Sequence, residues 1–226
     1  MSNQTNFIDL NTIYTEKIEK NDWVITKISL TEEQVRLEKM QNFRNYFMVA
    51  GLKANFEYVK LFRKKDGIWM SDTPMERNSN KRFIQNANGD VLIFGLGLGL
   101  IIFPLLEKES VKSIKVVELN QEIIDLVCPY IWAKDTHNKF SVIQGDAYEH
   151  HKIDNQKYDC VYGDIWRDIS TDNYEEIKTL TKNWKNRINR SNQNSFIDHW
   201  MKDFLKAEIR KEQRERSFWQ GHFNIF

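Results

Sequence analysis

Glycines and acids that follow short apolar segments are the residues of this chain best suited to binding a ligand. The clearest group is the glycine turn Gly95-Leu-Gly-Leu-Gly99, which follows the apolar run 91–94 and precedes a helical pattern. Glycine lets the backbone turn sharply and approach a ligand closely, and the first amides of the following helix are free to donate hydrogen bonds. The spacing is G-x-G-x-G, and no Gly-Lys-Ser/Thr follows it as in a P-loop. We expect a nucleotide-like ligand to contact Gly95, Leu96, Gly97 and Gly99.

Acids follow the next strand patterns in chain order. Glu118 ends the second pattern, where an acid can accept hydrogen bonds from the ribose hydroxyls of an adenosine. Asp146 and Ala147 follow the third, where the acid can accept from the adenine amino group and the small residue leaves room for the ring. Because ligands bind at the carboxyl ends of strands in open α/β sheets, these side chains are expected to meet at one sheet edge. Leu119, next to Glu118, belongs to the same expected cofactor-binding set.

The fourth strand pattern is followed by the candidate catalytic residues. Asp164, which with Ile165 also belongs to the cofactor-binding set, and Asp168 are carboxylates able to take a proton from a nucleophile. Asp168 equally fits the acid that favours a helix N-terminus. Trp166 would form a wall of the acceptor pocket, although packing in the core is the simpler interpretation. No metal is expected, because the adjacent residues of His150-His151 would point apart.

This ordered series resembles the class I S-adenosylmethionine-dependent methyltransferase superfamily, and especially its spermidine synthase-like branch, over about residues 68–168. The resemblance implies S-adenosylmethionine, or its decarboxylated form, as the cofactor. It also implies an acidic pair after a hairpin, for which Asp72 and Glu76 are loose counterparts. The resemblance assigns the family's glycine motif to Gly95, Gly97 and Gly99, and its ribose-binding acid to Glu118. It assigns the adenine-side Asp-Ala pair to Asp146 and Ala147, and the motif after the fourth strand to Asp164.

The residues after the fourth strand fit no reaction subclass of that superfamily cleanly. Aminopropyltransferases carry Asp-x-x-Asp there, whereas the second acid of Asp164-Ile-Trp-Arg-Asp168 comes one residue later. The proline-containing motif of amino-directed methyltransferases is missing, and Cys128-Pro129 reverses the Pro-Cys of cytosine C5 enzymes. We therefore favour a methyltransferase of unknown acceptor. An aminopropyltransferase is the alternative, and a non-catalytic cofactor-binding protein is the third hypothesis.

Composition narrows the class of partner and the compartment. The 226 residues hold 33 Lys and Arg against 32 Asp and Glu, which argues against a strongly basic nucleic-acid binder and favours a small-molecule acceptor. Cys128 and Cys160 lie in apolar surroundings and are expected to be buried free thiols. Glycines and Pro104 interrupt the longest apolar run, so no membrane span is expected. With no signal-peptide pattern at the N-terminus, we expect a cytoplasmic protein.

The elements that position these residues are expected to divide at residue 75. Residues 1–75 predict a small α+β extension, with a strand over 23–29 and a hairpin of strands 56–62 and 68–70. Thr31-Glu-Glu-Gln34 fits a capping box, and the following helix would have one face made of Val35, Met40, Phe43 and Phe47.

Residues 76–226 predict a Rossmann-like parallel sheet flanked by helices, which makes the fold class α/β. The expected strands are 91–94, 114–118, 140–144 and 158–162, and the expected helices between them include 98–107 and 121–127. After Asp172 only helical patterns are found. A helix packed on the sheet would use the stripe Phe196, Ile197, Trp200, Met201, Phe204, Leu205 and Ile209. The aromatic-rich end 218–226 is compatible with a homodimer contact.

Overall fold

A five-stranded parallel sheet forms the centre of the computed structural model, which describes residues 7–223. The strand order is β7-β6-β5-β8-β9. Within this sheet the chain first forms the middle strand β5, then β6 and β7 toward one edge, and then β8 and β9 on the other side of β5. All five strands therefore direct their carboxyl ends to the same edge of the sheet. The strands are β5 (Gly89–Phe94), β6 (Val111–Glu118), β7 (Phe140–Gln144), β8 (Cys160–Gly163) and β9 (Phe196–His199).

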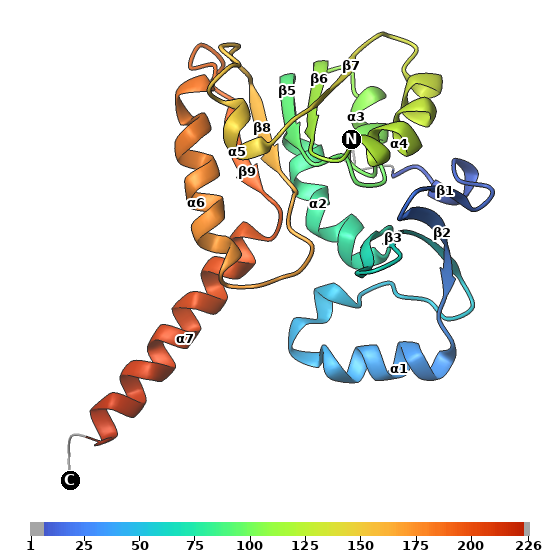
Figure 1. The fold of residues 1–226 in the computed structure, drawn as a ribbon. Coiled ribbons are helices and arrows are strands. Elements are labelled where there is room, and N and C mark those ends of the chain that lie inside the picture. The colour runs from blue at the N-terminus through green and yellow to red at the C-terminus, as the bar shows by residue number, and fades with distance from the viewer. Residues whose placement is uncertain (1–6, 224–226) are drawn as a thin grey trace.

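Helices cover both faces of this sheet (Figure 1), as the buried contacts of β5 show. Val91 and Ile93 belong to a cluster with residues of α2, α3 and α4, whereas Leu92 and Phe94 pack with residues of α6 on the other face. The alternation follows from the two-residue period of a strand. The protein is thus a Rossmann-like α/β fold. The helices are α2 (Pro74–Asn86), α3 (Ile102–Leu106), α4 (Gln121–Lys134), α5 (Ala147–His150), α6 (Asn173–Trp184) and α7 (Lys202–Phe223).

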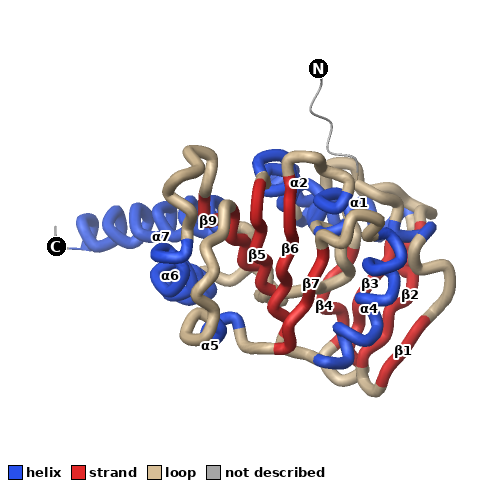
Figure 2. Tube along the Cα trace, turned by 90° about the horizontal axis from the view of Figure 1, so that it is seen from above, coloured by secondary structure: helices blue, strands red, loops and turns tan. Residues whose placement is uncertain are grey.

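A second, antiparallel sheet of four strands precedes the parallel one, and Figure 2 shows the strands of the two sheets as separate groups. Its strands are β1 (Ile18–Lys20), β2 (Trp23–Ser29), β3 (Glu57–Arg63) and β4 (Gly67–Ser71). Its inner residues Ile25 and Leu61 share one buried cluster with the glycine turn residue Leu98. The hydroxyl of Tyr14 also donates to the Leu98 carbonyl at 3.0 Å. The N-terminal sheet is therefore packed directly against the part of the Rossmann-like unit that carries the glycine turn.

Several elements agree with the sequence-based expectations. The strands 23–29 and 140–144 are found with those bounds, and the capping box of Thr31 and Gln34 is present at the start of α1 (Glu32–Gln41). Cys128 and Cys160 are buried free thiols, and burial raises the pKa of Cys128 to about 12. Within residues 7–223 no helix has both the length and the apolar composition needed to cross a bilayer.

The expectation of purely helical structure after Asp172 is wrong. Residues 196–199 form β9, which pairs in parallel with β8, and α7 begins only at Lys202. Apolar residues in this segment fit both a helical stripe and a short buried strand, and such short runs are ambiguous by periodicity. Met201, with a φ of 56°, separates the two elements.

Other elements differ in extent. The helix expected over 98–107 starts at Ile102, because the residues before it complete the glycine turn. The helix expected to continue through 47 ends at Gln41, and a 3-10 segment, Phe43–Met48, follows. The strand β1 and the helices α2 and α5 were not expected. The side chain of Phe47 and those of the aromatic end 218–226 lie outside what the structure describes.

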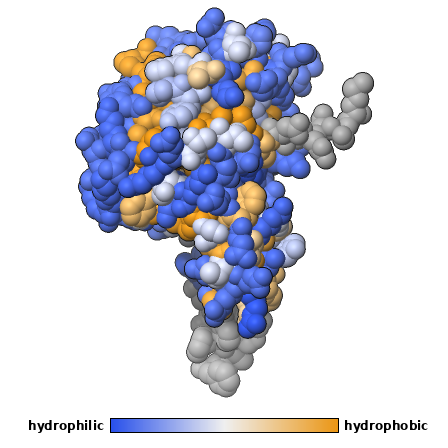
Figure 3. Space-filling model, turned by 90° about the vertical axis from the view of Figure 1, so that its right-hand side faces the viewer, coloured by the Kyte–Doolittle hydropathy of each residue, from blue (hydrophilic) through white to orange (hydrophobic). Residues whose placement is uncertain are grey.

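Charged and polar residues cover most of the face drawn in Figure 3, with apolar residues between them. The described part of α7 extends away from the rest of the molecule (Figure 1), and its residues 210–217 are exposed. They carry both signs of charge, as is typical of a solvated helix face.

Candidate functional site

A cavity of about 350 Å³ opens at the carboxyl ends of the parallel strands, a volume within the usual range of small-molecule sites. The residues that follow β5, β6, β7 and β8 all contribute to its wall, and the hairpin strand β4 closes it with Trp69 and Met70. Of the expected ligand-binding residues, the cavity is lined by Gly95, Leu96, Gly97, Glu118, Leu119, Asp146, Ala147, Asp164 and Ile165. Gly99 and Asp168 are not among its lining residues.

The glycine turn is held in place on both sides by contacts that leave no room for a side chain. Gly95 has a φ of 92°, and a Cβ there would collide with the Asp164 carbonyl oxygen at the end of β8. Gly97 has a φ of 50°, and a Cβ there would collide with the sulfur of Met70. That sulfur also accepts the Leu98 amide at 3.4 Å. Gly99 serves packing, since a Cβ there would approach Phe103 to 3.0 Å.

Glu118 joins the glycine turn to the end of β6. One carboxylate oxygen accepts the Leu96 amide at 2.8 Å, and the other accepts the backbone amide of Asn120 at 2.9 Å and its side-chain amide at 3.3 Å. The residue is buried, with 6% of its surface exposed, and it forms part of the cavity wall. Glu118 therefore stands where the sequence placed it and also fixes the turn.

Asp146 and Ala147 occupy the start of α5. Asp146 is the N-cap of this short helix, and one of its oxygens accepts the Tyr148 amide at 2.8 Å. Ala147 is buried and lines the cavity. The second carboxylate oxygen of Asp146 accepts no hydrogen bond from the described residues, so it is available to a ligand.

Asp164 and Glu76 place two carboxylates in the wall of the cavity. Burial raises the pKa of Asp164 to about 7. Burial and the nearby charge of Asp164 also raise the pKa of Glu76 well above its usual value. The Glu76 side chain, 8% exposed, accepts no hydrogen bond from the described residues. A buried carboxylate pair of this kind binds a proton or a cation readily.

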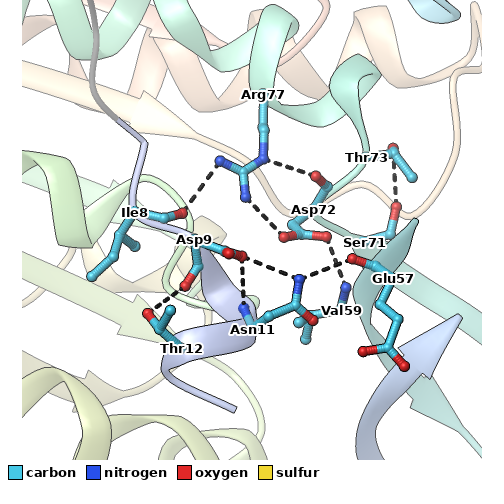
Figure 4. A network of polar contacts seen from close by, with 10 residues as sticks. All are labelled: Ile8, Asp9, Asn11, Thr12, Glu57, Val59, Ser71, Asp72, Thr73 and Arg77. Carbon is cyan, nitrogen blue, oxygen red and sulfur yellow. Dashed lines mark hydrogen bonds and ion pairs between the residues drawn. The ribbon is translucent and has the colours of Figure 1, made fainter. Parts of the chain in front are cut away.

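Asp72, the other loose counterpart of a family acid, has a structural role instead (Figure 4). Its carboxylate accepts the Val59 amide at 2.8 Å and the Arg77 guanidinium at 2.8 Å. Arg77 also donates to the carbonyls of Asp72 and Ile8. This network, which does not line the cavity, ties the N-terminal segment and the hairpin to the first turn of α2, and thereby positions Glu76.

Trp166 forms part of the cavity wall, as one of the two interpretations expected, whereas Asp168 is exposed outside it. The carbonyl of Asp168 accepts the Asn173 side-chain amide at 2.8 Å at the start of α6, which fits its helix-start interpretation. The Trp166 indole donates to a Glu176 carboxylate oxygen at 2.7 Å, and the Tyr148 hydroxyl donates to the same oxygen at 2.9 Å. Glu176 thereby holds two aromatic walls of the cavity.

The lining residues that were not expected from the sequence include Trp69, Tyr148, Glu176 and Trp200. Trp69 lies on a predicted hairpin strand and Tyr148 directly follows the Asp-Ala pair, so their neighbourhoods carried a signal. Glu176 and Trp200 reach the cavity only through the packing of α6 and β9, for which no local pattern exists.

Comparison with known proteins adds a family to this geometry. Residues 75–186 match the spermine/spermidine synthase domain. Over these residues the chain is spermidine synthase-like. The spermidine synthase-like segment begins at α2 and ends beyond α6, so it contains every cavity residue expected from the sequence. No curated protein matches the chain by sequence.

Comparison with solved structures also finds matches to part of the chain. Spermidine synthase from Thermotoga maritima is 15% identical, with a TM-score of 0.39, over 58% of this chain and 50% of that one. Fibrillarin from Aeropyrum pernix, solved with natively bound S-adenosyl-L-methionine, is 14% identical with a TM-score of 0.39, over 50% of this chain and 46% of that one. The methyltransferase CcbJ from Streptomyces caelestis is 20% identical with a TM-score of 0.36, over 45% and 39%. The chain thus spans about half the length, or less, of these three structures.

The donors and acceptors of the cavity fit an adenosyl cofactor. Glu118 and Asp146 offer acceptors at adjacent strand ends, and Leu119 and Ile165 add apolar surface. The backbone amides of Gly97, Leu119 and Ile165 donate no hydrogen bond to the described residues, although all three residues line the cavity. Free backbone donors at strand ends are typical of nucleotide sites in α/β proteins.

Proposed function

We propose that this protein is a transferase that binds an S-adenosylmethionine-type cofactor in the cavity and methylates a small-molecule acceptor. The observation that carries the proposal is the single cavity shared by the residues after β5, β6, β7 and β8, with Glu118 and Asp164 in its wall. The spermidine synthase-like family match supports the transferase class. Methyl transfer and a small-molecule acceptor, rather than a nucleic acid, are the finer part of the proposal and rest on the sequence motifs and on the near-neutral net charge of +1.

Different residues of the cavity position the cofactor, exclude water and accept the proton. Glu118 and Asp146 hold and orient the adenosine part, and the apolar walls exclude water from the reacting groups. When bound, the cofactor supplies an electrophilic carbon on a sulfonium; the carbon–sulfur bond breaks, with its electrons going to sulfur, as the acceptor bonds to that carbon. Asp164 accepts the proton that the acceptor then releases, a role suited to a carboxyl whose pKa is about 7.

One observation favours a second candidate, the transfer of an aminopropyl group from the decarboxylated cofactor. Glu76 and Asp164 form a pair of carboxylates in the cavity wall. Such a pair attracts an ammonium group and repels the carboxylate that S-adenosylmethionine carries and its decarboxylated form lacks. The late second acid, Asp168, lies outside the cavity, so aminopropyl transfer would rely on Glu76 and Asp164.

Calorimetry with S-adenosylhomocysteine tests the common basis of both candidates, and absence of binding at millimolar ligand would overturn it. Incubation with either cofactor form and a pool of amines, followed by mass spectrometry, separates them. Methyl transfer yields S-adenosylhomocysteine and an acceptor heavier by one methyl group, whereas aminopropyl transfer yields methylthioadenosine. Tight binding without any product would instead favour a non-catalytic cofactor-binding protein.

A further inference from the structure

The topology divides the cavity into two parts. Most of the residues assigned to the cofactor follow β5, the middle strand of the sheet, and β6 and β7 on one side of it; the exceptions, Asp164 and Ile165, follow β8. The remaining wall comes from elements on the other half or above it: the loop after β8, Trp200 after β9, Glu76 on α2, and the hairpin strand β4. Because the order of strands reverses between β5 and β8, the acceptor has its own side of the cavity.

Three tryptophans line this second part, and contacts hold each of them in place. The Trp166 indole donates to Glu176 at 2.7 Å, and the buried Trp200 donates to the Ser79 hydroxyl at 3.0 Å. Trp69 packs edge-on against Trp23 with ring centroids 5.1 Å apart. Rings held in this way present flat apolar surfaces without losing further side-chain freedom on binding.

Acidic side chains outnumber basic ones in this part of the cavity. Glu76 and Asp164 supply two carboxyl groups, and Arg167 is the cationic side chain among the lining residues. Arg167 is already engaged, because it donates to the carbonyls of Asp66 and Ile68 and lies over the Trp69 ring at 5.7 Å. The Glu76 carboxylate accepts no hydrogen bond from the described residues and so has no donor unless a ligand supplies one.

We propose, on the basis of the function proposed above, that the acceptor is an amine carried on an aromatic or similarly flat apolar body. The amine contacts Glu76 and Asp164, and the flat body lies against Trp166 and Trp69. An aliphatic polyamine carries charge along its whole length and requires carboxylates spaced to match. Here the unengaged acids lie together, and the adjoining walls are indole rings, which suit an aromatic body and also attract a cation.

The test is calorimetric titration of the full chain saturated with S-adenosylhomocysteine, using three matched probes: phenethylamine, 1,4-diaminobutane and 2-phenylethanol. We expect phenethylamine to bind about tenfold more tightly than either of the others, because it alone has both the ring and the charge. Equal or tighter binding of 1,4-diaminobutane, equal binding of 2-phenylethanol, or no binding of phenethylamine overturns the proposed acceptor class. Failure of S-adenosylhomocysteine itself to bind overturns the proposed function, and the acceptor class with it.

Two variants assign the binding to the named side chains. Trp166→Leu is expected to weaken phenethylamine about tenfold while leaving S-adenosylhomocysteine affinity within about twofold. Trp132→Leu, at a tryptophan 54% exposed on α4 and outside the cavity, is the matched control and is expected to change neither affinity. Glu76→Gln is expected to abolish the preference for phenethylamine over 2-phenylethanol, whereas Glu109→Gln, at an exposed acid outside the cavity, is expected to preserve it. Unchanged probe affinities in Trp166→Leu and Glu76→Gln would contradict the proposal.

Discussion

The carboxylate of Glu118 anchors the glycine turn, and in the proposed function it also accepts hydrogen bonds from the ribose, so both roles use the same lone pairs. A carboxylate offers about four acceptor positions, and the amides of Leu96 and Asn120 occupy three of them. One position is left for a ribose hydroxyl. A second hydroxyl can be accepted only if the Asn120 side-chain amide, the longest of the three bonds at 3.3 Å, moves away. In the proposed function, Glu118 therefore contacts the ribose from a position that the glycine turn already fixes.

Replacement of Glu118 separates these two tasks. Glu118→Ala is expected to weaken S-adenosylhomocysteine binding about 10–100-fold, because both the ribose acceptor and the anchor of the Leu96 amide are lost. Glu118→Gln keeps one acceptor oxygen and should fall between Ala and the native residue. Calorimetry measures both, and Glu109→Ala, at an exposed acid at the opposite end of the sheet, controls for the loss of charge. Native affinity in Glu118→Ala would contradict the assigned role.

Asp164 and Asp168 give a matched pair for the proton-accepting step. With a pKa of about 7, Asp164 gains its accepting form as the pH rises, so turnover is expected to increase between pH 6 and 8. Asp164→Asn should lower the rate by about 10²–10⁴ while S-adenosylhomocysteine still binds. Asp168→Asn, which alters an exposed acid outside the cavity, should leave the rate unchanged. An unaltered rate and pH profile in Asp164→Asn would show that another group takes the proton.

At the scale of elements, the glycine turn is the point where three strand ends meet. Gly95 donates to the Val117 carbonyl of β6 at 3.0 Å, and the Asp164 amide donates to the Phe94 carbonyl of β5 at 2.9 Å. Gly95→Ala would drive a Cβ into the Asp164 backbone, which cannot move without separating β5 from β8. Gly97→Ala would meet only the flexible end of the Met70 side chain. The two glycines are therefore expected to differ in how much stability they control.

Urea unfolding measures that difference. Gly97→Ala is expected to lower the free energy of unfolding by about 1–2 kcal/mol, mainly through its positive φ. Gly95→Ala adds backbone overpacking and is expected to cost about 3–5 kcal/mol. The double variant Gly97→Ala with Met70→Ala tests whether Met70 contributes to the smaller cost. Equal losses at positions 95 and 97 would argue against the contact with Asp164 as the cause.

The elements that the sequence predicted well are those with a local physical signal. The ends of β5, β6 and β7 follow from apolar runs closed by glycine or an acid, which is why Gly95, Glu118 and Asp146 were placed correctly. The sequence also holds a local signal for the start of α2, since Pro74 occupies the first turn of this helix, the position where proline is favoured. For β9 no local signal distinguishes a strand from a helix, because its pairing with β8 rather than the periodicity of its residues makes it a strand.

At the scale of the whole molecule, the cavity exists because two sheets share one core. The parallel sheet supplies the strand ends, and the N-terminal sheet supplies Trp69 and Met70 through β4. Figure 4 shows how Arg77 connects the segment at Ile8 with Asp72 and the start of α2, which holds Glu76 at the junction. The sequence predicted the part of the cavity wall that follows β5, β6 and β7, since its residues share one local pattern. The other part arises from long-range packing, so Glu176 and Trp200 could not be grouped with it in advance, and Glu76 was linked to the site only through the family resemblance.

Burying Glu76 and Asp164 together at this junction makes the stability of the whole fold depend on pH. Both carboxyls have a higher pKa in the folded state than in the unfolded chain, so the folded protein binds protons at these two groups more tightly than the unfolded chain does. Their contribution to stability is fully present below the unfolded pKa values and declines as the pH rises through about 7. Between pH 5.5 and 8.5 the pair should therefore destabilise the fold progressively. Asp154 and Asp159, whose pKa values are lowered, lose their contribution only at more acidic pH.

Glu76→Gln removes one ionisable carboxyl of the pair while nearly keeping the shape of the side chain. Most substitutions at buried sites lower stability, whereas this one is expected to raise it. The variant is expected to melt about 3–6 °C higher than the native chain at pH 8.5, and the difference is expected to shrink at pH 5.5, because a raised pKa favours the neutral form of Glu76 as the pH falls. Glu109→Gln, which changes an exposed acid, should track the native chain at both pH values. Thermal unfolding followed by circular dichroism makes the comparison. A lower melting temperature for Glu76→Gln at pH 8.5 would mean that the ionised Glu76 carboxylate is stabilised in the fold, and would contradict the raised pKa that burial and the charge of Asp164 give this group.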